Sequence, residues 1–119
     1  MMALYFKDTE FNCPCCGKGS ELMDPNLIHI LDLVREETGR PIHITSAYRC
    51  EKHNKEVGGV AESAHTEGKA VDIKCNNSTL RMLYVCLFCA HGIKRLGIGK
   101  TFIHIDMDDT LPQNVMWLY

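Results

Sequence analysis

The stretch Ser63-Ala64-His65-Thr66-Glu67-Gly68-Lys69-Ala70-Val71-Asp72-Ile73 places two potential metal ligands around the start of a predicted β-strand. We predict the strand over Ala70 to Lys74, with His65 in the loop before it. Because alternate residues of a strand share a face, Asp72 points away from its apolar neighbours, which face the core. A carboxylate in the middle of an apolar strand needs a partner, because burying it unpaired is costly. A metal ion is one such partner.

A second predicted strand, Phe102 to Met107, carries the same kind of signal. His104 and Asp106 share one face of it, and isoleucines occupy the other face. A lone histidine on a strand is more often a hydrogen-bonded core residue than a ligand. Two histidines and one carboxylate, however, form a known catalytic zinc shell that leaves the fourth position to water. His65, Asp72 and His104 are therefore the candidate ligands.

Length and composition limit the classes of protein to which this chain can belong. It has 119 residues, 45% of them apolar and 24% charged, with a net charge of -2. This is typical of one soluble globular domain, 1–119. The basic footprint of a nucleic-acid partner is absent, and no apolar run approaches the ~20 residues of a membrane helix. Met1 to Glu10 has no apolar signal-peptide core, so we expect cytoplasmic synthesis; the oligomeric state is left open.

Helical and strand patterns alternate irregularly along the chain. Asp24-Pro25 is a helix-start signal, and apolar residues at helical spacing predict a helix over 25–38 that ends at Gly39. The other predicted elements are an irregular arm (1–19), strands at 41–46 and 93–97, helices at 50–57 and from Ser78 to Gly92, and a loop-like tail at 108–119. This order favours a small α+β domain with a short, mainly antiparallel sheet flanked by helices.

Seven cysteines are many for this length, and an odd number cannot all pair within one chain. Cys13 and Cys16 have the spacing of half a zinc knuckle, and Cys50 is a candidate third ligand. The alternatives are a disulfide formed after release from the cell, or free thiols. Cys86 and Cys89 repeat the spacing on a predicted helix, where we expect burial instead.

Several motifs together identify a resemblance. They are Ser46-Ala47-Tyr48-Arg49-Cys50, His53-Asn54, Val57-Gly58-Gly59-Val60, Ser63-Ala64-His65, Gly68-Lys69-Ala70-Val71-Asp72-Ile73 and Phe102-Ile103-His104-Ile105-Asp106. In this order the chain resembles the zinc D-alanyl-D-alanine carboxypeptidase family, especially its small members from phages and bacteria. The resemblance implies the compact α+β fold shared with the signalling domain of hedgehog proteins. It also implies one catalytic zinc held by His65, Asp72 and His104, and substrates among the peptides of bacterial cell-wall peptidoglycan.

The resemblance also assigns roles to two further residues. Arg49 matches the family's arginine, which would stabilise an oxyanion or hold a substrate carboxylate; the alternative is a surface salt bridge. Better-characterised members carry an acid or histidine shortly before the last ligand, whereas 99–103 contain neither. Asp106 is the most economical substitute as general base. Its alternative role is to orient the histidine ligand.

Three functions follow as hypotheses. The first is a zinc peptidase acting on peptidoglycan stem peptides, as a D,D-carboxypeptidase or an endopeptidase, and the lack of a signal peptide suits a phage endolysin that reaches the cell wall after release. The second is a catalytically inactive binding or structural module stabilised by zinc on the same fold. The third is a domain that is stabilised by a bound metal and forms part of a phage or secretion particle.

Overall fold

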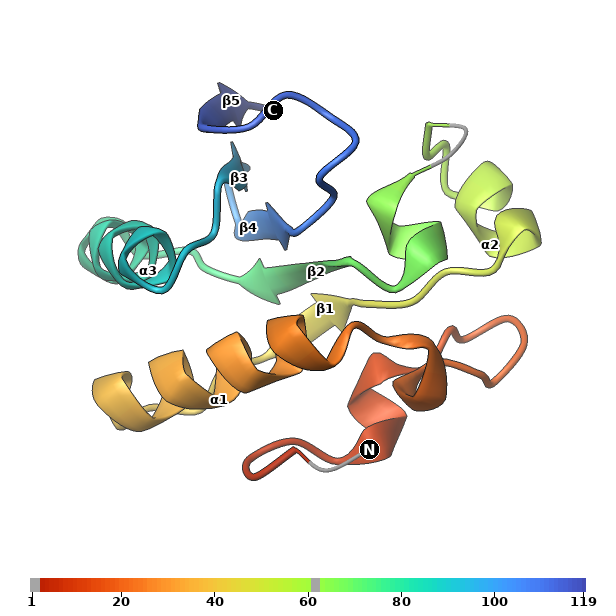
Figure 1. The fold of residues 1–119 in the computed structure, drawn as a ribbon, viewed down its shortest axis with the longest axis horizontal. Coiled ribbons are helices and arrows are strands. Elements are labelled where there is room, and N and C mark those ends of the chain that lie inside the picture. The colour runs from red at the N-terminus through yellow and green to blue at the C-terminus, as the bar shows by residue number, and fades with distance from the viewer. Residues whose placement is uncertain (1–2, 61–62) are drawn as a thin grey trace.

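The computed structural model describes residues 3–60 and 63–119 and shows an α+β domain built on one five-stranded sheet (Figure 1). The strand order is β1-β2-β4-β3-β5. The strands are β1 (Ile44–Ser46), β2 (Ala70–Lys74), β3 (Arg95–Ile98), β4 (Phe102–Asp106) and β5 (Val115–Leu118). All neighbours pair antiparallel except β3 and β5, which are parallel. The predicted fold class is confirmed.

In the described part of the chain, three α-helices and three short 3₁₀ helices accompany the sheet. They are α1 (Pro25–Thr38), α2 (Glu51–Glu56), α3 (Ser78–Ala90), η1 (Asp8–Phe11), η2 (Ser20–Leu22) and η3 (Ala64–Glu67). The bounds of α1 match the prediction because both ends are encoded locally. The Asp24 side chain accepts the Asn26 amide N–H at 2.8 Å, and Gly39 ends the helix in the left-handed conformation. Among the described helices, none is both long and apolar enough to cross a membrane.

The hydrophobic core lies against one face of the sheet and leaves the other face for polar side chains. Val71 and Ile73 of β2 and Ile103 and Ile105 of β4 are fully buried in it. They pack with residues of α1 and α3, including Leu27, Leu31, Val34, Tyr84 and Phe88. This packing fixes the orientation of β2 and β4, so their intervening residues, Asp72 and His104, point to the opposite face.

Two sequence predictions are wrong. The tail is not all loop, because Val115–Leu118 forms β5 beside β3. The pairing partner lies some twenty residues away in sequence, so local patterns did not reveal it. Cys86 and Cys89 are exposed rather than buried. The buried stripe of α3 follows Tyr84 and Phe88, at i,i+4 spacing, and the cysteines lie off that stripe.

Several predicted boundaries also shift. The first strand is shorter than 41–46, β3 begins two residues later than predicted, and the arm contains η1. A loop is predicted over 60–68; residues 61 and 62 lie outside the described part of the chain, and the remainder contains η3 immediately before β2. This last difference matters for function, because η3 carries His65.

Candidate active site

The three candidate ligands come from adjoining elements on the polar face of the sheet. Asp72 on β2 and His104 on β4 are directly opposite each other in the antiparallel register, which places their side chains side by side. His65 lies on η3. Gly68 closes this helix with a φ of +72°, and a Cβ there would lie 1.9 Å from the Leu22 carbonyl oxygen. Only glycine satisfies both constraints, so the turn that delivers His65 depends on it.

The ligand atoms of these residues converge on one point. The Asp72 carboxylate oxygen Oδ1 lies 2.9 Å from His104 Nδ1 and 3.4 Å from His65 Nε2. One donor atom from each residue lies within 4.8 Å of the other two. Both histidines are almost completely buried. The structure therefore brings together the three residues that the sequence singled out.

The far side of each imidazole ring is held by an oxygen atom. His65 Nδ1 lies 2.7 Å from the Ala47 carbonyl oxygen, which can only accept, so Nδ1 carries the proton and Nε2 presents a lone pair to Asp72. His104 Nε2 lies 2.7 Å from Asp106 Oδ2. This is the arrangement of metal-binding histidines, whose second nitrogen donates to a carbonyl or carboxylate.

Burial and the close contacts between these side chains shift the pKa values of His104 and Asp72 in opposite directions. Burial lowers the pKa of His104, but its hydrogen bonds to Asp106 and Asp72 outweigh burial and raise it above the ordinary value. Burial raises the pKa of Asp72, but the two histidines hold it well below its usual range. The lone pairs of His65 and Asp72 face each other across the gap. A zinc ion would satisfy all three donors at once, and the residues fit a two-histidine, one-carboxylate site.

Asp106 has both carboxylate oxygens occupied. Oδ2 accepts from His104, and Oδ1 accepts from Arg95 Nε at 2.7 Å and from the Asp108 amide at 3.1 Å. Its side chain is 2% exposed. Sequence reasoning missed Arg95, which sits opposite Asp106 in the β3–β4 register and stacks 5.0 Å from the Trp117 ring. A charged residue at the start of a short apolar strand was the available signal.

Arg49 borders the same site. Its Nε donates to Ser46 at 3.1 Å, one NH1 hydrogen to Asn54 at 3.2 Å and one NH2 hydrogen to Asp72 at 3.4 Å. The Asn54 amide nitrogen in turn donates to the Val60 carbonyl at 2.8 Å. Arginine has five N–H donors, so two remain for a ligand.

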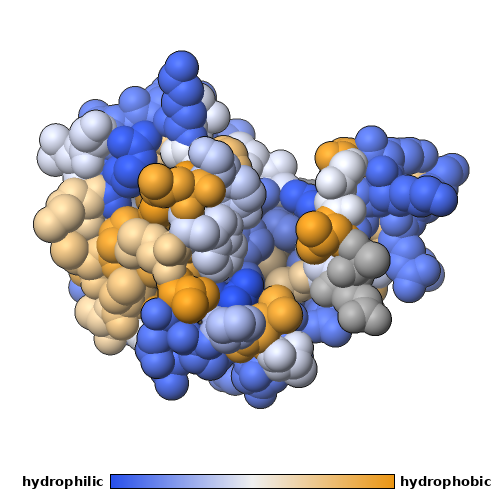
Figure 2. Space-filling view, turned by 90° about the horizontal axis from the view of Figure 1, so that it is seen from above, coloured by the Kyte–Doolittle hydropathy of each residue, from blue (hydrophilic) through white to orange (hydrophobic). Residues whose placement is uncertain are grey.

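A cavity of about 560 Å³ opens over these residues. Its lining residues include Arg49, His65, Asp72 and His104. Trp117 and Tyr119, from the end of the chain, form an aromatic part of its wall. The space-filling view shows a hollow between the main body of the domain and the smaller lobe on its right (Figure 2). A cavity of this size suits a short peptide.

Among the described residues, a second group also has metal-binding geometry. Cys13, Cys16 and Cys50 place one sulfur each within 4.8 Å of the others. This group lies outside the cavity lining.

Comparison with known proteins gives one clear match. The family model for Peptidase M15 matches residues 4–106, which include all three candidate ligands, Arg49 and Asp106. No curated protein matches the chain.

Proposed function

The chain belongs to the Peptidase M15 family, and from that premise we propose that it is a zinc-dependent peptidase that hydrolyses peptidoglycan stem peptides. The observation that carries the proposal is the convergence of His65 Nε2, Asp72 Oδ1 and His104 Nδ1 beside an open cavity. The substrate class comes from the family. The proposal covers a terminal D,D-carboxypeptidase cut and an internal endopeptidase cut, and action at the cell wall after release, as in a phage endolysin.

The zinc would be held by the two histidines and Asp72. When bound, zinc polarises a peptide carbonyl and lowers the pKa of water, which is the chemistry that amide hydrolysis requires. The protein's part is to fix the three donors. Ala47 orients the His65 ring and Asp106 orients the His104 ring, so neither ligand has to reorganise on binding metal.

Arg49 is the proposed substrate-binding and charge-stabilising residue. Its contacts to Ser46 and Asn54 hold the guanidinium at the cavity wall. The two free N–H groups would donate to the substrate carbonyl oxygen as negative charge develops there, or to a terminal carboxylate. Arg49→Lys keeps the charge but removes the fork of donors, so we expect slower turnover in the zinc-loaded enzyme.

Asp106 is proposed to position His104 rather than to act as general base. Both of its oxygens already accept hydrogen bonds, and the side chain is buried. Of the two roles that the sequence left open, orientation of the ligand uses the contacts that exist.

One observation favours the second candidate function, an inactive zinc-stabilised binding module. Residues 99–103, which directly precede His104, include no acid and no histidine. The Asp106 carboxylate already accepts a hydrogen bond from Arg95. Such a module would retain the metal and the cavity without cleavage.

The deciding experiment uses zinc-loaded protein with purified cross-linked and uncross-linked muropeptides, and mass spectrometry of the products. We expect cleavage that a chelator abolishes and that zinc restores. His65→Ala should lose the zinc of the histidine site and, with it, cleavage. His43→Ala, an exposed histidine on the same domain, should keep both. Zinc binding without cleavage would support the binding module, and a chain that binds no zinc at this site would overturn both functions.

A further inference from the structure

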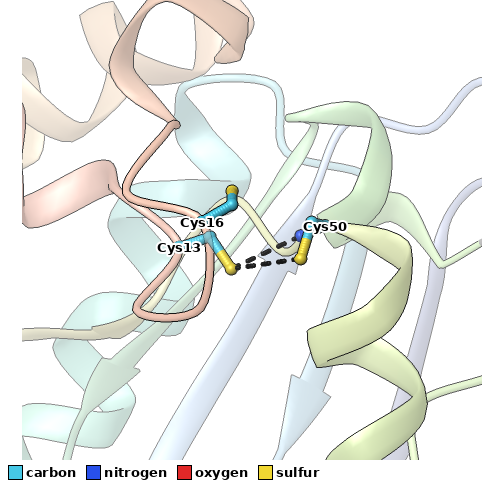
Figure 3. A group of neighbouring side chains, drawn as sticks. All are labelled: Cys13, Cys16 and Cys50. Atoms are coloured by element: carbon cyan, nitrogen blue, oxygen red, sulfur yellow. Dashed lines mark hydrogen bonds between the residues drawn. The ribbon is translucent and has the colours of Figure 1, made fainter.

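The cysteine group joins two segments that are distant in sequence. Cys13 and Cys16 belong to a tight turn in the N-terminal arm, and Cys50 immediately precedes α2 (Figure 3). The turn is closed by the Gly17 amide, which donates to the Cys13 carbonyl at 2.8 Å, and by the Cys13 amide, which donates to Lys18 at 2.7 Å. Gly17 has a φ of +72°. The sequence therefore folds locally into a loop that brings the Cys13 and Cys16 sulfurs within 4.8 Å of each other and of the Cys50 sulfur.

The spacing of the Cys13 and Cys50 sulfurs matches one edge of a tetrahedral zinc site. Cys13 Sγ and Cys50 Sγ are 3.7 Å apart. With zinc–sulfur bonds of about 2.3 Å, the edge of a tetrahedron is about 3.8 Å, whereas a disulfide requires about 2.0 Å. Cys16 Sγ is also within 4.8 Å of both sulfurs. We propose that Cys13, Cys16 and Cys50 bind a second, structural zinc ion.

Backbone amides around the group favour thiolates. The Cys50 amide points at Cys13 Sγ at 3.5 Å, and the His53 amide points at Cys50 Sγ at 3.4 Å. Several thiolates this close repel one another unless a cation lies between them.

The location gives this site a structural role. The Tyr48 amide donates to the Phe11 carbonyl, and Arg49 lies directly before Cys50. A zinc ion here would tie the arm to the segment that carries Arg49. For a domain of 119 residues such a link adds stability that a small core cannot easily supply. The inference is independent of catalysis and of the proposed peptidase activity.

The test measures metal content of the full chain, purified with reduced thiols. We expect two zinc ions per chain, one of which is released by a mercurial thiol reagent. Cys16→Ser, at an exposed position that should not impair folding, is expected to bind one. The matched control is the double change Cys86→Ser and Cys89→Ser, which removes the same spacing from exposed positions on α3 and should still bind two.

A second measurement separates this site from the histidine site. In a His65→Ala, His104→Ala background, cobalt should still bind and give a thiolate-to-cobalt charge-transfer band in the near ultraviolet. Adding Cys50→Ser should remove the band. The inference is overturned if this background binds no metal, if Cys16→Ser leaves the zinc count unchanged, or if anaerobically purified protein contains a Cys13–Cys50 disulfide.

Discussion

The change Asp106→Asn tests how the protein holds its third ligand. Asp106 Oδ1 receives two donors, Arg95 Nε at 2.7 Å and the Asp108 amide at 3.1 Å, whereas Oδ2 receives one, His104 Nε2. An asparagine has a single acceptor oxygen, and the side with two donors will retain it. Its NH₂ group then faces His104 Nε2. To avoid two opposing donors, the histidine must move its proton to Nδ1, the nitrogen that faces Asp72 and the metal position.

The size of the effect follows from these contacts. The variant loses a buried charge-assisted hydrogen bond, worth about 1.5–3 kcal/mol, and the favoured tautomer no longer presents Nδ1 to zinc. Loss of an outer partner of a metal ligand costs about 10–100-fold in affinity, or about 1.4–2.7 kcal/mol. The two figures agree, so we expect zinc at the histidine site to bind about 10–100-fold more weakly.

The assay is a competitive zinc titration against a chromogenic chelator, in a Cys16→Ser background that isolates the histidine site. Asp109→Asn, an exposed change in the following loop, is the matched control and should bind zinc normally. If Asp106→Asn binds zinc as tightly as the parent chain, the orienting role is wrong. Unchanged zinc affinity combined with lost cleavage would instead assign Asp106 as the general base.

Three further predictions concern stability and the cavity wall. In the metal-free chain, the raised pKa of His104 contributes stability that is present below about pH 6.5 and is lost as the pH rises through the pKa of the folded state. The lowered pKa of Asp72 contributes stability that is present above about pH 3.8 and is lost in acid. The urea concentration at the unfolding midpoint should therefore be highest between about pH 4 and 6.5, and a continuous rise to pH 8 would contradict this. Leu31→Ala, at a fully buried position on α1, should lower the free energy of unfolding by about 2–5 kcal/mol, and a loss below about 1 kcal/mol in denaturant titration would show that the core is not packed as described. Gly97→Ala would place a Cβ 2.6 Å from the Trp117 indole nitrogen, so it should cost about 1–3 kcal/mol and shift the emission of the chain's single tryptophan; an unchanged emission spectrum would argue against this wall of the cavity.

The elements whose signals are local could be predicted from the amino-acid sequence. The ends of α1 were predictable because Asp24, Pro25 and Gly39 cap it directly. The bounds of β2 were predictable because its apolar residues are flanked by turn residues. The alternating pattern also assigned Asp72 and His104 to the polar faces of their strands, and the motif spacing pointed to His65. These features can be predicted because each depends only on neighbouring residues or on the two-residue repeat of a strand.

Which of these faces meet depends on the assembled fold and could not be predicted from local patterns. A two-residue period says which way a side chain points but not which strand lies beside it, and the β2–β4 register sets Asp72 opposite His104. The parallel addition of β5 and the approach of Cys50 to Cys13 across 37 residues likewise depend on closing long loops, and the contact of Arg95 with Asp106 depends on the β3–β4 register. Such contacts form only when the whole core is assembled, because their ordering entropy is offset by burial elsewhere in the chain.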